Sequence, residues 1–165
     1  FHRFILGTYE VMGRLVDTFP NLLFENCSGG GGRYDPGMMY YSPQIWCSDN
    51  TDSISRADIQ FGSSLCYPAS VQGAHVSASS RTGYETKKNM ALWGSFGYEL
   101  DPAELSPEDE EIVRGQIAQY HKYYNVIHYG DLYRLICPWN NPYKVAWEYV
   151  SQDKKEAMVT VMTKL

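Results

Sequence analysis

The chain has 165 residues, of which 44% are apolar, and this length and composition fit one globular domain with a sizeable core. Its formal net charge of −5 argues against nucleic acid or an anionic membrane as the main partner, because both select basic patches. The sequence shows no signal peptide and no apolar stretch long enough to span a bilayer, so we expect a cytoplasmic protein.

The four cysteines lie at wide and irregular spacings, and no two of them form a C-x-x-C pair. Such spacing fits neither a zinc site nor a disulfide framework. We therefore expect reduced thiols and no metal. The four are Cys27, Cys47, Cys66 and Cys137.

Aromatic residues make up 15% of the chain and include 14 Tyr and 4 Trp. Tyr and Trp can stack on the C–H face of a sugar ring and hydrogen-bond its hydroxyls. They also pack the half-buried surfaces of ordinary domains, so the composition favours sugar binding only slightly.

The first part of the chain alternates between helical and strand-like patterns. Apolar residues recur at three- and four-residue spacings up to Pro20, which predicts an amphipathic helix that this proline ends. A short apolar run then leads into four glycines, as expected for a buried strand that ends in a functional loop. The expected elements are a helix at 1–19, a buried strand at 21–27, a long loop at 28–43, a strand at 44–48 and a helix at about 51–65.

The middle of the chain continues this alternation. We expect a strand at 73–77, a helix at 85–94 and a strand at 95–100. A further helix should open at Ser106, because Ser106 is a suitable N-cap, Pro107 fits the first helical position, and acids fill the first turn.

Successive strand-then-helix units predict an α/β fold with a parallel sheet built from right-handed crossovers, and the sheet is expected to be incomplete. From Asp131 onwards the pattern changes to short apolar or alternating runs separated by turn signals. This change predicts the start of an antiparallel sheet. The expected domain division is therefore 1–130 and 131–165.

The loop E-N-C-S-G-G-G-G-R-Y-D at 25–35 follows the first expected strand. A phosphate-binding loop would require Lys and then Ser or Thr after the glycines, whereas this chain has Arg33 and Tyr34. Glycines also allow close approach to other ligands, or simply a tight turn. Both of these alternatives stay open from the sequence.

Asp49 and Asp52 lie between the second expected strand and the helix that follows it. An aspartate just before a helix is more often a cap than a catalyst. Asp52 is expected in the first helical turn, where it favours the helix dipole, whereas Asp49 lies at the strand end and can point into a cleft. Asp49 is therefore the candidate for proton chemistry, and Asp52 is a weaker candidate.

His75 lies in the third expected strand, G-A-H-V-S. It could contact a ligand or hold its neighbours through hydrogen bonds. A lone histidine more often has the structural role.

Four blocks of the sequence carry a family resemblance: L-L-F-E-N-C-S-G-G-G-G-R-Y-D-P-G-M-M-Y-Y-S-P-Q-I-W-C-S-D-N-T-D, G-A-H-V-S, F-G-Y-E-L-D and Y-G-D-L-Y-R-L. They resemble bacterial α-galactosidases of glycoside hydrolase family 36, which cleave melibiose and raffinose. The resemblance runs over essentially the whole chain. It implies the second half of a (β/α)8 barrel, strands five to eight, followed by the start of an antiparallel C-terminal β domain.

The resemblance also implies roles for individual residues. Asp49 matches the general acid/base, Cys27 and Gly29 match residues lining the galactose subsite, and Trp46 lies beside that subsite. Arg33 and Asp35 match the family motif, but we expect them to support the loop. The implied mechanism is retaining double displacement with two carboxyls about 5–5.5 Å apart, without a metal or an organic cofactor.

The K-W-D motif that carries the family's nucleophile does not occur in this sequence. We therefore expect the isolated chain to lack appreciable α-galactosidase activity, because the groups of such a site act together. A half barrel also exposes sheet edges, which the missing N-terminal half of the enzyme or a second copy would cover. The full-length protein is expected to be a homo-oligomer that binds galactose or an α-galactoside oligosaccharide.

Two alternatives remain at this stage. One is a non-catalytic carbohydrate-binding or assembly fragment, and the other is an unrelated α/β domain in which Asp49 merely caps a helix. The segment H-V-S-A-S-S-R-T-G-Y-E-T-K is also shorter than its counterpart in the family, which leaves any aglycone contact from that loop in doubt.

Overall fold

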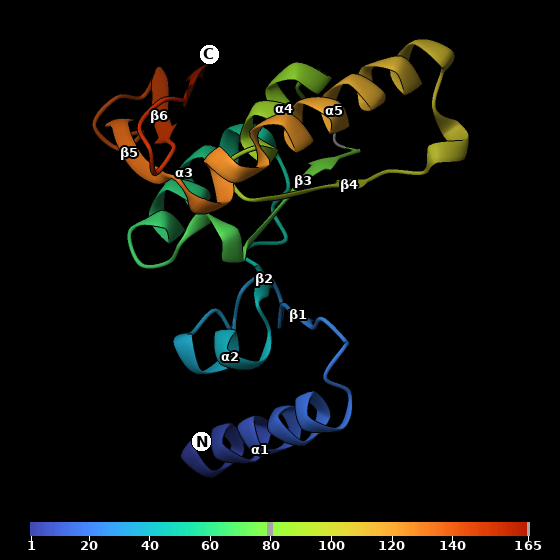
Figure 1. Ribbon diagram of the computed structural model, residues 1–165, viewed down its shortest axis with the longest axis vertical. Coiled ribbons are helices and arrows are strands. Elements are labelled where there is room, and N and C mark those ends of the chain that lie inside the picture. Colours follow the sequence, from blue (N-terminus) through green and yellow to red (C-terminus); the bar gives the residue numbers. More distant parts are fainter. Residues whose placement is uncertain (79–80, 165) are drawn as a thin grey trace. The chain divides into compact units, whose positions relative to one another are not determined.

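The computed structural model describes residues 1–78 and 81–164 (Figure 1). The chain forms two compact units, Phe1–Asp49 and Asn50–Leu165, which we call the N-terminal and the C-terminal unit. In the part of the chain that is described, no helix has both the length and the apolar character needed to cross a membrane.

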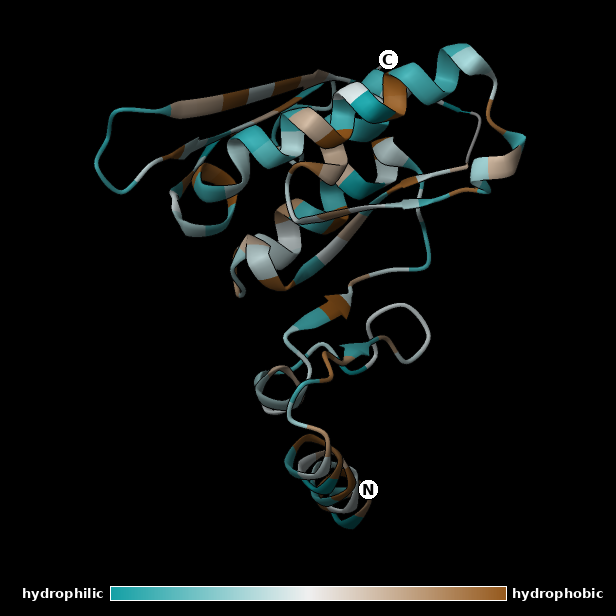
Figure 2. Ribbon diagram, turned by 45° about the vertical axis from the view of Figure 1, so that its right-hand side comes forward, coloured by the Kyte–Doolittle hydropathy of each residue, from teal (hydrophilic) through white to brown (hydrophobic). Residues whose placement is uncertain are grey.

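The N-terminal unit contains two helices and one parallel strand pair, and its first helix confirms the prediction from apolar spacing. Asn26 lies opposite Ile45 in the strand pair. Apolar and polar residues both occur along α1, and no residue of this helix is buried (Figure 2). The elements are α1 (His2–Thr18), β1 (Glu25–Asn26), α2 (Pro36–Tyr41) and β2 (Gln44–Trp46).

Two predictions for this unit were wrong. The expected loop at 28–43 contains α2, which begins because Asp35 accepts a hydrogen bond from the Met38 N–H (3.0 Å) and a proline occupies the first turn. The expected buried strand at 21–27 has only two strand residues, and Leu22 and Leu23 are 57% and 88% exposed. An apolar run is buried only where other elements cover it, and nothing in the N-terminal unit covers these two leucines.

The C-terminal unit contains a parallel pair, β3 with β4, and a three-stranded antiparallel sheet in the order β5-β6-β7. The antiparallel character confirms the prediction for the chain after Asp131. Helix α4 ends earlier than expected, and neither 3₁₀ turn was predicted. The elements are α3 (Ser53–Ser64), η1 (Ala69–Val71), β3 (Gln72–Ser77), α4 (Tyr84–Ala91), β4 (Ser95–Glu99), η2 (Pro102–Glu104), α5 (Pro107–Tyr129), β5 (Asp131–Ile136), β6 (Lys144–Val150) and β7 (Ala157–Thr163).

The core of the C-terminal unit joins its helices to the antiparallel sheet. Trp93 follows α4 and stacks on Trp147 of β6 with ring centroids 4.0 Å apart, and both side chains are fully buried. The Tyr149 hydroxyl donates to the Trp93 carbonyl at 3.2 Å. The sheet and the helices therefore share one hydrophobic cluster. The domain boundary at residue 130 stays a prediction.

Tyr98 connects β4 to α5. Its hydroxyl donates to Gln116 Oε1 at 2.9 Å, and Gln116 is 4% exposed. Burial, with a smaller contribution from the nearby Tyr84, raises the pKa of Tyr98 to about 12. The folded state thus keeps the phenol neutral at a pH where the unfolded chain releases the proton.

We expect this raised pKa to make the protein less stable in alkali. Tyr98 favours the folded state fully below its unfolded pKa near 10, and this contribution is lost as the pH rises to about 12. The loss in the free energy of unfolding should be about 1 kcal/mol, less than the full shift implies, because Tyr98 is partly exposed and solvent screens its charge. Urea unfolding of the wild type and of Tyr98→Phe between these pH values tests the prediction. The free energy of unfolding should fall less steeply with pH in the variant than in the wild type. Equal slopes would contradict the prediction.

Candidate active site

The glycine-rich loop after β1 has an unusual backbone. Four consecutive residues, Ser28 to Gly31, have φ values of +64°, +66°, +73° and +97°. Residues with a Cβ rarely adopt this left-handed region, whereas glycine does so without a steric penalty. The glycines therefore allow a tight turn, which was one of the two alternatives that the sequence left open.

This loop also comes very close to the segment after β2. A Cβ on Gly30 would lie 2.7 Å from the Asp49 backbone nitrogen and 3.3 Å from Asp49 Oδ2. A Cβ on Gly31 would lie 2.7 Å from the Cys47 carbonyl oxygen. Only hydrogen fits at these positions. The loop after the first strand is thus packed directly against the candidate carboxylate.

Asp49 is exposed and lies beside Cys27. The Cys27 Sγ is 3.9 Å from Asp49 Oδ1 and accepts a hydrogen bond from the Gly30 N–H at 3.3 Å. Within the described residues, no salt bridge and no helix N–H engages the Asp49 carboxylate. Both the thiol and the carboxylate can therefore reach a ligand that enters from solvent.

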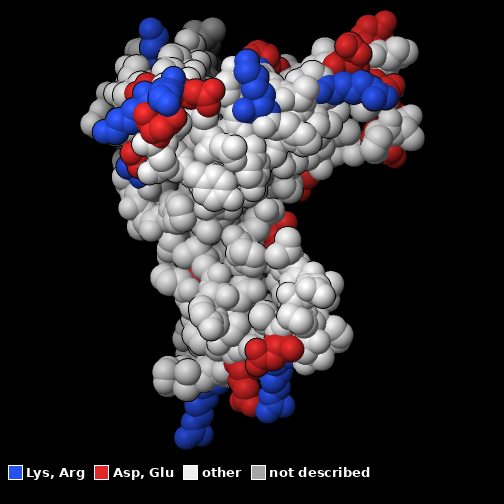
Figure 3. Space-filling view, viewed as in Figure 1, with Lys and Arg blue, Asp and Glu red and all other residues white. Residues whose placement is uncertain are grey.

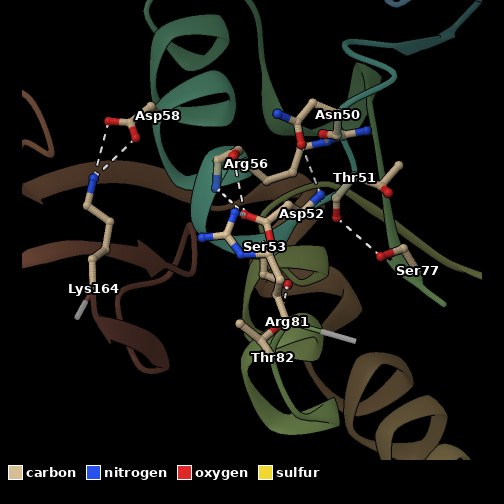
Figure 4. Close-up of polar contacts among 11 residues, drawn as sticks. Asn50, Thr51, Asp52, Ser53, Arg56, Asp58, Ser77, Arg81, Thr82 and Lys164 are labelled. Carbon is tan, nitrogen blue, oxygen red and sulfur yellow. Dashed lines mark hydrogen bonds and ion pairs between the residues drawn. The ribbon is translucent and has the colours of Figure 1, made fainter. Parts of the chain in front are cut away.

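Asp52, by contrast, has a structural position (Figure 4). It is the N-cap of α3 and accepts from the Ser55 N–H at 3.0 Å, one position earlier than the first-turn placement that we expected. Arg81 forms an ion pair with the same carboxylate oxygen at 3.3 Å. The two aspartates thus divide as the sequence suggested: Asp52 caps the helix, and Asp49 does not.

The remaining candidates of the N-terminal unit lie around this loop. Trp46 belongs to β2 and is only 8% exposed. Gly29 is open, with nothing within 4 Å of a Cβ placed on it. Arg33 is partly buried, and its backbone N–H donates to the Cys27 carbonyl at 3.4 Å.

Asp35 supports the loop, as we expected for it. The Tyr9 hydroxyl donates to Asp35 Oδ1 at 2.7 Å, in addition to the N-cap contact of α2. This hydrogen bond is the largest cause of a raised pKa for Tyr9. Sequence reasoning missed Tyr9, because nothing in the pattern of a helix indicates which loop one of its residues contacts.

His75 is packed between its neighbours in the C-terminal unit. It lies opposite Gly97 in the β3–β4 pair, and a Cβ on Gly97 would be 2.8 Å from the imidazole ring. Its Nδ1 lies 3.9 Å from Glu99 Oε1. These surroundings agree with a structural role. The short loop that follows this strand includes residues 79–80, which lie outside the described part of the chain.

The sequence profile of the melibiase family matches residues 1–130. The chain belongs to the melibiase family. It is 46% identical to the α-galactosidase AgaA of Geobacillus stearothermophilus and 48% identical to the bifunctional α-galactosidase/sucrose kinase AgaSK of Mediterraneibacter gnavus, each over 96% of this chain. A crystal structure of an AgaA variant in complex with raffinose superposes with a TM-score of 0.96 at 44% identity over 99% of this chain.

This melibiase chain spans about a fifth of the length of these relatives. It covers 22% of AgaA and 18% of AgaSK, and 24% of the chain in the raffinose complex. The matched relatives are glycoside hydrolase family 36 enzymes, which confirms the resemblance seen in the sequence. Among the described residues, no group of three or more His, Cys, Asp or Glu side chains could hold a metal ion.

Proposed function

We propose that this melibiase chain is part of a retaining α-galactosidase in which Asp49 is the general acid/base. The observation that carries the proposal is the position of Asp49 at the end of β2, exposed, beside Cys27 and Gly30, and free of the capping role that Asp52 fills. The names of the relatives support the reaction class. Crystal structures of AgaA variants contain raffinose and stachyose, which supports an oligosaccharide substrate.

In this reaction Asp49 first protonates the glycosidic oxygen of a terminal α-linked galactose. A carboxylate outside this chain attacks the anomeric carbon and forms a galactosyl-enzyme. Asp49 then removes a proton from the water that releases galactose, so the same residue serves as acid and as base. The two carboxyls should stand about 5–5.5 Å apart.

The proposal also assigns the strands of this chain to two domains of the enzyme. Strands β1 to β4 would be strands five to eight of a (β/α)8 barrel, and β5 to β7 would begin the C-terminal antiparallel domain. The strand-helix order, the parallel pairs and the high TM-score support this assignment. The carboxyl-terminal ends of the barrel strands would then lie on one face of the barrel, which is the face that carries the active site in barrel enzymes.

We expect the isolated 165-residue chain to be inactive, because its sequence lacks the nucleophile motif. Hydrolysis of an aryl α-galactoside by the purified chain, with Asp49→Asn beside it, tests this. No turnover from either is the expected result. Turnover that disappears with Asp49 would mean that a carboxylate within this chain replaces the nucleophile.

In the full-length protein, we expect Cys27 to assist Asp49 by holding its carboxylate in place. Replacing Cys27 with Ala should lower kcat/KM by a factor of about 2–10, the usual effect of one neutral hydrogen bond. Cys27→Ser keeps a donor at this position and should recover part of the loss. Steady-state kinetics of both variants and of the wild type measure kcat/KM. Equal kcat/KM in the wild type, Cys27→Ala and Cys27→Ser would rule out a contribution from the thiol.

A further inference from the structure

Arg56 is a buried arginine near the start of α3. It is only 4% exposed, and no other arginine among the described residues is buried. The Lys and Arg side chains visible in Figure 3 lie at the surface, as is usual for these residue types. Burying a guanidinium is costly unless its N–H groups find acceptors. The acceptors of Arg56 therefore show which parts of the fold it holds together.

Arg56 donates to two backbone carbonyls from different segments. Its Nε donates to the Asn50 carbonyl at 2.8 Å, and its Nη1 donates to the Gly73 carbonyl at 3.2 Å. Gly73 belongs to β3 and lies opposite Ser95 in the β3–β4 pair. A guanidinium presents its donors in a rigid planar fork, so one side chain can hold two carbonyls in a fixed arrangement. Arg56 thus ties the segment after β2 to a strand of the parallel pair.

The other residues of this segment are held as well (Figure 4). The Ser77 hydroxyl, also from β3, donates to the Thr51 carbonyl at 3.2 Å. The Asp52 N–H donates to Asn50 Oδ1 at 3.2 Å, and the Asp52 side chain caps α3. The three residues 50–52 are therefore fixed, one after another, by contacts within the C-terminal unit.

Asn50 is the residue that follows Asp49, the general acid/base of the proposed function. Among the described residues, no helix N–H and no salt bridge engages the Asp49 carboxylate itself. Its position therefore depends on the backbone on either side of it. Gly30 packs against the Asp49 backbone nitrogen on one side, and Arg56 holds the carbonyl of the next residue on the other. A shift of Asn50 would shift Asp49 with it, because the two are bonded directly.

We propose that Arg56 is a positioning residue for Asp49, and that its guanidinium fixes the backbone that carries the acid/base carboxylate. This proposal rests on the role of Asp49 proposed above. A general acid has to lie within hydrogen-bond reach of the glycosidic oxygen, and a misplacement by about 1 Å can lower the rate about 10²-fold. Arg56 acts only through the backbone of Asn50 and does not itself contact the substrate.

Gln60 offers a matched control one turn further along α3. It is 1% exposed, and its Nε2 donates to the Met90 carbonyl at 2.9 Å. Both side chains are thus buried donors to backbone carbonyls, but Gln60 holds α4 rather than the segment that follows Asp49. Arg56→Met and Gln60→Met should each lower the denaturant concentration at which the protein unfolds, because each leaves a buried carbonyl without its donor. Only Arg56→Met should also change the chemistry.

In the full-length protein, the ratio of kcat/KM for an activated aryl α-galactoside to kcat/KM for raffinose separates these effects. A smaller folded fraction lowers both values equally and leaves the ratio unchanged, whereas a misplaced acid lowers the value for raffinose alone. We expect the ratio to rise about 10- to 100-fold in Arg56→Met and to stay at the wild-type value in Gln60→Met. Arg56→Lys keeps a charged donor, so its ratio should lie between those of the wild type and Arg56→Met.

Asp49→Asn is measured beside these variants and should raise the same ratio. Adding Arg56→Met to Asp49→Asn should not raise it again, because the acid through which Arg56 acts is then already absent. An unchanged ratio in Asp49→Asn would overturn the proposed role of Asp49, and the role of Arg56 with it. A raised ratio in Asp49→Asn, with the wild-type ratio in Arg56→Met and Arg56→Lys, would overturn the role of Arg56 alone. An equal rise in Gln60→Met would do the same.

Discussion

Replacing Asp49 with Asn in the full-length protein is expected to lower kcat for raffinose by about 10²–10⁴-fold, the usual contribution of a positioned general acid. The loss should be largest for raffinose, because a sugar leaving group needs protonation. An aryl α-galactoside with a good leaving group needs little protonation, so formation of the galactosyl-enzyme should be nearly unaffected. Comparing kcat/KM for the two substrates measures this difference, because kcat/KM reports formation of the galactosyl-enzyme, whereas the later water step, which also needs Asp49, is common to both.

Asp52 provides the matched control, three positions further along the chain. Asp52→Ala removes the N-cap of α3 and should cost about 1 kcal/mol in the free energy of unfolding. The kcat of Asp52→Ala should stay close to that of the wild type. Asp49→Asn should show the opposite pattern: it should lose kcat but unfold at the same denaturant concentration as the wild type. A large loss of kcat in Asp52→Ala, with none in Asp49→Asn, would reverse the assignment of the two aspartates.

Gly30→Ala is expected to have the second large effect, on both stability and turnover. Alanine at a φ of +73° costs about 1–2 kcal/mol. The new methyl would also lie 2.7 Å from the Asp49 backbone nitrogen, and relief of such overpacking typically costs about 1–3 kcal/mol more. Because the backbone of Asp49 has to move, kcat should fall as well.

Gly29→Ala separates the two causes. Its φ of +66° is nearly the same, but nothing lies within 4 Å of the added Cβ. This variant should therefore carry only the backbone strain, about 1–2 kcal/mol, and keep the Asp49 carboxylate in place. Chemical unfolding of both variants tests the comparison, and raffinose kinetics are measured for Gly30→Ala against the wild type, because Gly29 is itself a candidate residue of the galactose subsite. Equal losses of stability in the two variants would show that the close approach of Gly30 to Asp49 has no energetic role.

Local signals predicted the elements whose ends are marked in the sequence. Ser106 and Pro107 mark the start of α5, and the Ser106 hydroxyl does accept from the Asp109 N–H at 3.1 Å. Asp35 and Pro36 carry the same kind of signal for α2, which was overlooked because the surrounding glycines and prolines suggested a loop. The distinction between Asp49 and Asp52 was also predictable, because it depends on distance from the helix start.

Contacts between distant residues were not predictable in this way. Cys27 and Asp49 are 22 positions apart, and their proximity depends on the pairing of β1 with β2. The stacking of Trp93 on Trp147 in the core is likewise a contact between distant positions that the sequence does not indicate.

Azide rescue of Asp49→Ala in the full-length protein tests the assignment of Asp49 most directly. In a retaining enzyme that lacks its acid/base, azide attacks the β-galactosyl-enzyme and does not need a general base. With an activated aryl α-galactoside, we expect azide to restore turnover and to give α-galactosyl azide, identified by its anomeric NMR signal. Formation of β-galactosyl azide would identify Asp49 as the nucleophile, and turnover unaffected by the substitution would contradict any catalytic role for it.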